Sequence, residues 1–537
     1  MIRMRFWPML VSILGLGALA IGASTVWTQE APRAEEGTEA RADDATVEKG
    51  VEVLARGPVH EAYAEPVTTK PRPGPLVRKQ PPAAIEEVPP DQKPEGENVQ
   101  WVAGYWGWED DRSDFIWVSG FWRTPPPDRR WVPGYWARAE GGSQWTPGFW
   151  EVEEQEDVTY LAPPPDPIDS GPNVPAPAAD NTWVPGCWVY RETRYVWRPG
   201  YWLAYRSGWV WVPAHYVWTP GGCVFVEGYW DYTLRSRGLL FAPVYLDPGL
   251  VRANWLYRPR HVVYTDFLFS ALFVRAGYGS YYFGDYFDPR YDRLGYVSWF
   301  DYRFGGRGYD PLYSYYRWEN RNDRRWDRDL RDLYVARRAG EAPRPPQTFA
   351  QQTTLIQNIN NKTVTVNNIK NVTVLAPMNQ VDRTVVKLQP VSPERLATER
   401  KHAQQLRQAT IVRQKTEVQV AAQGPPRRPN DAPRSAKLEV TKHPAAAAKP
   451  SGKAAPSPPP PVKPEVRPAG KPQAKPEPRG PEPKGPAPKP APKPEPKPKE
   501  RPKPEPKPQP EPKPKEKPKP EPKPAPKPSD KDKKDKG

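Results

Sequence analysis

Residues 101–150 read WVAGYWGWEDDRSDFIWVSGFWRTPPPDRRWVPGYWARAEGGSQWTPGFW, and this stretch decides the fold. It contains four copies of the pattern Trp-x-x-Gly-x-Trp, and two intact and two altered copies follow between residues 183 and 230. The copies begin at Trp101, Trp117, Trp131, Trp145, Trp183, Trp197, Trp211 and Phe225. Their starts are 16, 14 and 14 residues apart in the first array, and 14 residues apart throughout the second. A short fixed period indicates structural units that bury their apolar faces on their neighbours.

Each unit divides into a strand of about nine residues and a turn of about four or five. The expected turns are polar or rich in glycine and proline, and they occupy residues 110–113, 125–128, 141–143 and 206–208. The Pro-Gly inside the motif indicates a mid-strand bulge, which would return both tryptophans of a unit to one face. We therefore expect a mainly β fold class, an antiparallel meander of four strands per array, with one C-terminal helix and long disordered segments.

The repeat aromatics are the candidate functional residues. They are Trp101, Trp106, Trp117, Trp122, Trp131, Trp136, Trp145, Trp150, Trp183, Trp188, Trp197, Trp202, Trp211 and Trp230. Large aromatic side chains build hydrophobic cores, and ordinary core residues such as Leu and Ile are scarce in this stretch. Their flat faces also stack on sugars, so the same residues could form a ligand platform. The sequence leaves both interpretations open.

These units resemble the bacterial YXWGXW (WXXGXW) repeat family of exported proteins, over residues 101–230. The resemblance implies export and a repeated β structure, but no reaction, because the family offers no catalytic residues to carry over. The copies at Trp211 (WVPAHY) and Phe225 (FVEGYW) depart from the pattern, as terminal repeats that cap a stack often do. The C-terminal tail resembles the Pro-Lys/Glu-Pro spacer of TonB-type proteins, and from that likeness only an extended spacer is expected.

The N-terminus has the features of a secretory signal. Arg3 and Arg5 precede an apolar run that ends in small residues at Ala20, Gly22 and Ser24. This pattern is typical of a cleaved signal peptide, although an uncleaved anchor fits its length. In both cases we expect an extracytoplasmic protein of the periplasm or outer envelope, or a secreted one, and contact with a membrane only if the segment is uncleaved.

Composition divides the remainder of the chain. With 77 Pro and 38 Gly, much of it cannot bury enough apolar surface to fold. The expected regions are a signal peptide or anchor (1–24), a disordered linker (25–98), the first repeat array (99–152), a proline-rich linker (153–180), the second array (181–232), a partly globular Tyr/Arg/Gly-rich region (233–340), an Asn/Thr/Val-rich β segment (341–390), a helix (391–420) and a disordered Pro/Lys/Glu-rich tail (421–537). Leu396, Ala403 and Thr410 stand at heptad spacing in that helix and indicate a weak coiled coil.

No catalytic motif is evident in the sequence. The five histidines (His60, His215, His261, His402 and His443) are scattered, and no metalloprotease, nucleophile-elbow or phosphate-loop pattern occurs. The carboxylates Asp285, Asp288, Asp292, Asp301 and Asp310 alternate with Arg and Tyr, so they indicate solvated ion pairs more than a calcium site. We therefore expect no enzyme activity, no catalytic, cofactor-binding or metal site, and no cofactor.

Cys187 and Cys223 are the only cysteines. An oxidising compartment favours a disulfide between them. In a simple meander, however, they would stand on the first and last strands of the second array, on the order of 14 Å apart, and a bridge needs Cα atoms within about 7 Å.

The formal charge of +16 suits anionic partners. We expect a non-enzymatic structural and interaction protein of the bacterial cell envelope, whose basic polyproline tail contacts or spans the wall. The expected partners are an anionic cell-wall polymer or an envelope glycan, with self-association through the Asn-rich segment and the helix, and no nucleic acid as cognate ligand. The alternative is a carbohydrate-binding module that uses exposed Trp and Tyr of the repeats.

Overall fold

The computed structural model describes residues 47–440 and residue 443, apart from residues 97, 170, 252–254, 305–307, 361–371, 385 and 439. The expected signal peptide or anchor, residues 25–46 of the expected linker, and the tail from residue 444 therefore lie outside the described residues. Among the described helices, none is both long and apolar enough to cross a membrane.

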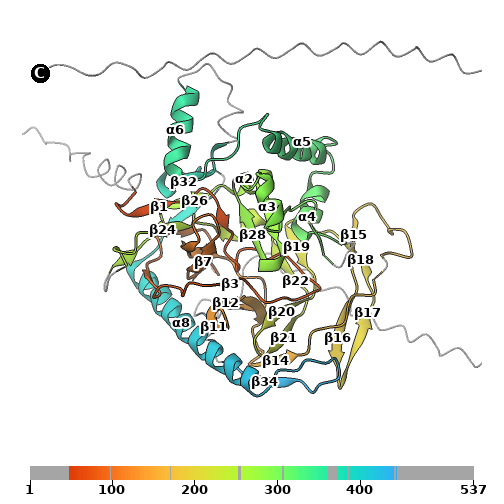
Figure 1. Ribbon diagram of the computed structural model, residues 1–537. Coiled ribbons are helices and arrows are strands. Elements are labelled where there is room, and N and C mark those ends of the chain that lie inside the picture. Colours follow the sequence, from red (N-terminus) through yellow and green to blue (C-terminus); the bar gives the residue numbers. More distant parts are fainter. Residues whose placement is uncertain are drawn as a thin grey trace, which may run out of the picture. The chain divides into compact units, whose positions relative to one another are not determined.

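Two consecutive repeats form one antiparallel hairpin, and each strand is interrupted at the glycine of its repeat (Figure 1). The first hairpin consists of β6 (Gln100–Val102), β7 (Tyr105–Glu109), β8 (Asp114–Val118) and β9 (Phe121–Arg123). β7 pairs with β8 next to the turn, and β6 pairs with β9 beyond the interruption. The expectation of antiparallel strands in the repeat region is confirmed.

Three further hairpins have the same plan. The second contains β10 (Arg129–Val132), β11 (Tyr135–Ala139), β12 (Gly142–Thr146) and β13 (Phe149–Val152). The third contains β15 (Asn181–Val184), β16 (Cys187–Arg191), β17 (Arg194–Arg198) and β18 (Tyr201–Ala204). The fourth contains β19 (Trp209–Val212), β20 (His215–Thr219), β21 (Gly222–Val226) and β22 (Tyr229–Tyr232).

The expected four-stranded meanders are not formed, because segments from outside the arrays occupy the hairpin edges. β9 pairs with β23 (Gly238–Leu239), β8 with β24 (Val244–Leu246), β12 with β3 (Leu76–Val77) and β21 with β14 (Asp157–Leu161). Residues 110–113 and 141–143 lie at hairpin turns as expected. Residues 125–128 and 206–208 instead connect one hairpin to the next.

Residues 47–96 differ from the expected disordered linker. They contain β1 (Val51–Val53), β2 (Gly57–Pro58), β3, β4 (Glu86–Glu87) and β5 (Gln92–Pro94). Several of their side chains are fully covered, including Ala55, Ala62 and Tyr63. The strands are only two or three residues long, so they are too short to show an alternating pattern in the sequence. Their partners are distant in the chain: β1 pairs with β24, and β2 with β28 (Ser280–Phe283).

The region after the repeats is densely packed and mixes strands with helices, so the fold class is mixed rather than mainly β. Besides β23, β24 and β28, its strands are β25 (Leu256–Tyr257), β26 (His261–Val263), β27 (Leu272–Arg275), β29 (Tyr296–Ser298), β30 (Arg303–Phe304) and β31 (Gly308–Tyr309). Its helices are η1 (Leu234–Ser236), α2 (Thr265–Ser270), η2 (Ala276–Tyr278), α3 (Pro289–Arg293), α4 (Pro311–Glu319) and α5 (Trp326–Ala339). The side chains of Asp288 and Asp310 accept hydrogen bonds at the N-termini of α3 and α4, each followed by proline, which favours helix initiation.

The C-terminal part begins with α6 (Phe349–Asn360), where a β segment was expected. The Asn/Thr/Val-rich core of that expected segment, residues 361–371, lies outside the described residues. After it come β32 (Leu375–Pro377), η3 (Met378–Gln380), β33 (Leu388–Pro390), α8 (Pro393–Ala422) and β34 (Arg434–Lys437). β34 pairs with β14, so the fold extends beyond residue 420, where the tail was expected to begin.

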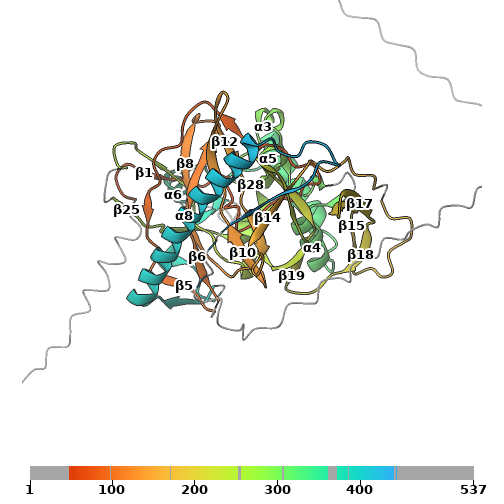
Figure 2. The same ribbon diagram turned by 90° about the horizontal axis from the view of Figure 1, so that it is seen from below.

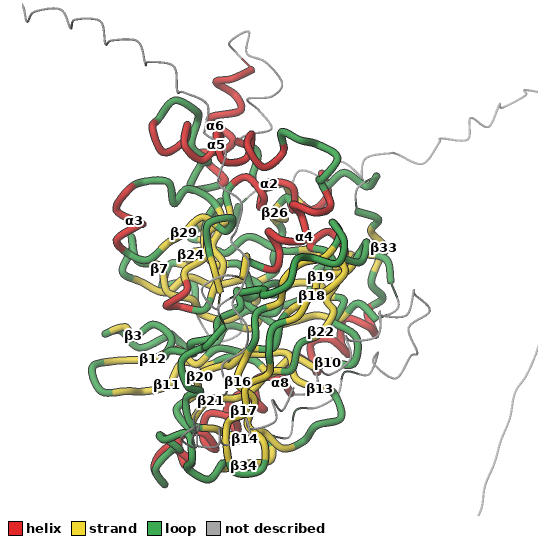
Figure 3. The backbone as a smooth tube through the Cα atoms, turned by 90° about the vertical axis from the view of Figure 1, so that its right-hand side faces the viewer, coloured by secondary structure: helices red, strands yellow, loops and turns green. Residues whose placement is uncertain are grey.

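α8 packs on the repeat hairpins of its own chain. It contacts β6 and β11, and Figures 2 and 3 show it on the side of the strands opposite to α2, α4, α5 and α6. Its buried residues include Glu399, Arg413 and Glu417 as well as Ala403 and Leu406. Because this partly charged face is covered by the hairpins, α8 offers no apolar heptad seam for the expected coiled coil.

Candidate functional site

Every intact repeat contributes to indole pairs that join two repeats across one hairpin. In the first hairpin the ring centroids of Trp101 and Trp122 are 5.4 Å apart, and those of Trp106 and Trp117 are 5.3 Å apart, both edge to face. The same pairing occurs for Trp131–Trp150, Trp136–Trp145, Trp183–Trp202, Trp188–Trp197 and Trp211–Trp230. In the fourth hairpin Tyr216 and Phe225 replace the second pair. The tryptophans are therefore cross-strand partners, whereas the sequence predicted only that the two tryptophans of one unit share a face.

The glycines of two repeats meet where the hairpin strands are interrupted. A Cβ atom on Gly104 would lie 2.4 Å from the Val118 carbonyl oxygen and 2.8 Å from the backbone nitrogen of Gly120. A Cβ atom on Gly120 would lie 2.5 Å from the Val102 carbonyl oxygen. The motif therefore needs glycine because the two strands of the hairpin approach each other too closely for any side chain. The N–H groups at this break have no partner in the strand ladder.

Buried carboxylates from distant segments accept hydrogen bonds from these N–H groups. Glu87 accepts from the backbone N–H groups of Gly104 (2.8 Å) and Gly120 (2.9 Å) and from Trp117 Nε1 (3.0 Å). In the second hairpin Glu61 accepts from the equivalent indole, Trp145 (2.7 Å), and from the N–H of Gly148 (3.0 Å). These bonds satisfy donors that the hairpin itself leaves open.

The third hairpin is capped by a shorter side chain. Asp169 accepts from the backbone N–H of Gly186 at 2.7 Å. None of these three acceptors was a candidate residue in the sequence, because they lie outside the repeats and share no period with them. The one available signal was an acidic residue in an otherwise apolar or proline-rich context.

A second set of buried charges ties the hairpins to each other and to α8. Arg123 at the end of the first hairpin donates two hydrogen bonds of 2.8 Å to Asp231 at the end of the fourth. Arg237 also pairs with Asp231. On α8, Glu399 accepts from the backbone N–H of Trp101 (3.0 Å), so the helix is fixed to the first repeat. These contacts make the arrays part of one packed body.

The repeat tryptophans differ in burial, which distinguishes those that form the core from those that could contact a ligand. Trp101, Trp106, Trp117, Trp122, Trp131, Trp145, Trp150 and Trp230 are buried. Trp136, Trp183, Trp188, Trp197, Trp202 and Trp211 are only half-buried. Four of these six belong to the third hairpin, so this hairpin leaves more of its indoles accessible to a ligand than the others do.

Burial shifts the titration of the capping carboxylates. It raises the pKa of Glu61 and of Glu87 from 4.5 to about 7, although their hydrogen bonds oppose the shift. Burial also lowers the pKa of His60, His215 and His261 from 6.5 to about 4. The folded protein keeps these histidines neutral, so their contribution to the free energy of unfolding decreases as the pH falls below 6.5. Each carboxyl group gives stability that is complete below pH 4.5 and is lost as pH rises through 7.

The substitution Glu61→Gln should remove one of these pH-dependent contributions. Between pH 4.5 and pH 8 the free energy of unfolding of the parent should fall by about 3 kcal/mol relative to that of the variant. The histidine contributions are common to both proteins and cancel in the comparison. Urea unfolding across this pH range measures the difference, with the exposed Glu95→Gln as control. Parallel profiles for the parent and Glu61→Gln would contradict the assignment.

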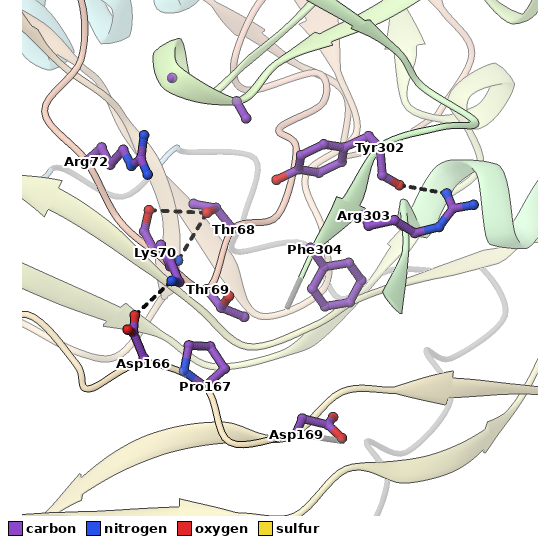
Figure 4. Close-up of a pocket in the computed structure, with 12 residues that line it drawn as sticks. Thr68, Thr69, Lys70, Arg72, Asp166, Pro167, Asp169, Tyr302, Arg303 and Phe304 are labelled. Atoms are coloured by element: carbon purple, nitrogen blue, oxygen red, sulfur yellow. Dashed lines mark hydrogen bonds and ion pairs between the residues drawn. The ribbon is translucent and has the colours of Figure 1, made fainter. Parts of the chain in front are cut away.

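Two large open clefts lie among the described residues. One, of about 670 Å³, is lined by Thr68, Lys70, Arg72, Asp166 and Arg303 among others (Figure 4). Lys70 forms an exposed ion pair with Asp166 at 2.8 Å, and Thr68 exchanges hydrogen bonds with Lys70. The other cleft, of about 490 Å³, lies between the third hairpin and α4.

The carboxylates considered for calcium are dispersed. Asp288 and Asp310 cap helices, Asp292 pairs with Arg338, and Asp301 pairs with Arg331. Asp285 lies near Gln347. Within the described part of the chain no group of three or more His, Cys, Asp or Glu side chains could hold a metal ion.

The two cysteines are free thiols, so the candidate disulfide is not formed in the structure. Cys187 begins β16, opposite Arg198, whose guanidinium donates to its sulfur at 3.2 Å. Cys223 is buried in β21 of the next hairpin, between Trp218 and Leu161. The two residues therefore lie in separate hairpins with different cross-strand neighbours.

The family model of the WXXGXW repeat (2 copies) matches residues 130–151, 182–202 and 206–230. These ranges fall on the second, third and fourth hairpins, so the chain contains WXXGXW repeats. The first hairpin lies outside the matched residues but has the same register, with two residues more between its repeat starts. No curated protein and no solved structure matches the chain.

Proposed function

We propose that this chain is a non-enzymatic structural and interaction protein of the bacterial cell envelope. The observation that carries the proposal is the use of the repeat residues. Most repeat tryptophans are buried in cross-strand pairs, and their glycines are held by buried carboxylates. A residue used in this way builds a rigid scaffold and is not free to react.

The location and the mode of attachment rest on the sequence. The basic and apolar N-terminal run supports export, and the proline-rich tail carries more lysine than glutamate. A composition with excess lysine suits anionic polymers through salt-sensitive contacts. Its expected role is to contact or span the wall.

A second candidate function is carbohydrate binding. It is favoured by the half-buried tryptophans of the third hairpin, two of which, Trp183 and Trp202, line an open cleft. The two functions are compatible, since three hairpins can serve as scaffold while one binds a ligand.

Sedimentation with insoluble cell wall across a salt series tests the proposal. The proteins compared are the chain without its signal segment and the same chain ended at residue 443, which keeps β34. If the tail is the anchor, the full chain should sediment at low salt, salt should release it, and the shortened chain should stay in solution. If the shortened chain remains bound in high salt, the repeats hold the ligand and the carbohydrate candidate comes first. Failure of both chains to sediment at low salt would contradict wall attachment.

A further inference from the structure

The cleft between the third hairpin and α4 combines aromatic faces with arginines. β15, β18 and α4 lie near one another (Figure 1). β15 and β18 supply Trp183 and Trp202, while α4 and the residues after it supply Arg317, Trp318 and Arg321. Its volume of about 490 Å³ is within the range of small-ligand sites. Indoles from two segments more than a hundred residues apart, Trp183 and Trp202 on one side and Trp318 on the other, line the cleft. The sequence alone did not predict that these segments lie together.

The aromatic walls are pre-arranged. The rings of Tyr205 and Trp318 are stacked, with centroids 5.0 Å apart and planes 18° apart. Trp183 and Trp202 form the edge-to-face pair of the hairpin. Tyr309, at the edge of the cleft, is 39 % exposed. Rigid aromatic faces at a cleft offer contact area at little cost in conformational entropy.

The charged side chains that line the cleft, Arg317 and Arg321, are both positive. Arg321 lies over Trp318, 4.5 Å from the ring centroid, and donates to the Trp318 carbonyl oxygen. Arg317 is exposed, with its guanidinium 5.8 Å from the Tyr309 ring. None of the described residues that line the cleft is acidic. Asn181, Thr182 and Ser314 add neutral groups that can donate and accept hydrogen bonds.

We propose that this cleft binds a sugar that carries a carboxylate. The proposal rests on the carbohydrate-binding candidate and adds the site and the charge of its ligand. The C–H face of a sugar ring stacks on an indole or phenol, and its hydroxyl groups need neutral polar partners. A carboxylate on the ring matches the planar fork of an arginine, which can bind it through two parallel hydrogen bonds.

The other occupants of this cleft fit less well. The proline-rich tail of the chain could dock on aromatic faces, but its excess of lysine is repelled by Arg317 and Arg321. A neutral glycan would leave the positive charge of both arginines unmatched. Single-stranded nucleic acid also stacks on aromatic residues and is anionic, so it is a separate outcome of the test.

Binding of two matched oligosaccharides to the full chain tests the proposal. The probes are an oligomer of galacturonic acid and the neutral oligomer obtained by reducing its carboxyl groups, measured by calorimetry at physiological ionic strength. The parent should bind the acidic oligomer at a saturable site and prefer it to the neutral one. Replacing both arginines (Arg317→Ala with Arg321→Ala) should weaken acidic binding at least about 10-fold and abolish the preference.

Two further variants separate charge, stacking and folding. Tyr309→Ala should weaken binding of both oligomers, since it removes a stacking surface. Arg324→Ala with Arg328→Ala removes the same charge from exposed positions outside the cleft and should leave binding unchanged.

Each adverse result has its own meaning. Equal binding of the neutral oligomer by the parent would overturn the acidic assignment and leave carbohydrate binding standing. Absence of saturable binding for both oligomers would overturn the inference and the carbohydrate candidate together, without affecting the scaffold proposal. Tighter binding of a single-stranded oligonucleotide, with the same sensitivity to Arg317 and Arg321, would replace the sugar by nucleic acid.

Discussion

Replacing Glu87 with alanine should lower the free energy of unfolding by roughly 4 kcal/mol, since each buried donor left unsatisfied costs about 1–3 kcal/mol. The carboxylate accepts three hydrogen bonds, from Gly104, Gly120 and Trp117. All three donors belong to the first hairpin, and the side chain removed is buried at its centre. The loss is therefore concentrated at the point where the strands are interrupted.

Denaturant unfolding of the full chain measures this loss. The matched control is Glu95→Ala, an exposed glutamate of the same segment, which should change the free energy of unfolding by less than about 0.5 kcal/mol. Glu87→Gln keeps the shape but retains a single acceptor oxygen, so it should fall between the parent and Glu87→Ala. If Glu87→Ala were as stable as the control, the carboxylate would not be holding the hairpin.

The repeat motif made the hairpins predictable. The alternation of Trp-rich strands with polar turns is visible in the sequence, and the turn at 110–113 is where it was expected. The pairing of repeats two by two was not predictable, since the composition of a turn did not distinguish a hairpin turn from a connection between hairpins. Residues 192–193, which close the third hairpin, carry no glycine or proline, whereas 125–128 contain three prolines and only connect two hairpins.

The segments that cover the hairpins were missed for a different reason. Residues 47–96 contribute strands of two or three residues whose partners lie up to hundreds of positions away. Short strands have no period, and their proline content is the same as that of a linker. Glu61 and Glu87 therefore lie in a segment that was predicted to be a disordered linker.

The candidate site could be predicted only in part. The repeat tryptophans were identified, but their motif is the same in a buried hairpin and in a half-exposed one. Burial is decided by what packs over the hairpin: Trp101 contacts Phe241, whereas Trp183 and Trp202 border the cleft beside α4. Arg317 and Arg321 were not candidates, because only the fold brings them to the repeats.

The glycine of the repeat leads to the second large effect. Gly104→Ala should destabilise the protein by about 3 kcal/mol, because overpacking against groups that cannot move is among the costlier core changes. The new Cβ atom would lie 2.4 Å from the Val118 carbonyl oxygen and 2.8 Å from the Gly120 nitrogen, and both are backbone atoms. To relieve the contact the two strands must separate, which weakens the hydrogen bonds from Gly104 and Gly120 to Glu87.

Unfolding free energies and the exciton signal of paired indoles in far-ultraviolet circular dichroism measure this effect together. Gly249→Ala is the control, since a Cβ atom there meets nothing within 4 Å and should cost less than about 0.5 kcal/mol. The fourth hairpin has a natural Ala214 in place of this glycine, and a Cβ atom on the facing Gly228 would lie 3.1 Å from the Ala214 nitrogen. That hairpin has a wider crossing that accommodates the Ala214 methyl group, so Ala214→Gly should cost only about 0.5–1 kcal/mol, through the greater backbone freedom of glycine in the unfolded chain. If Gly104→Ala were equally harmless, close strand approach would not explain the glycine of the motif.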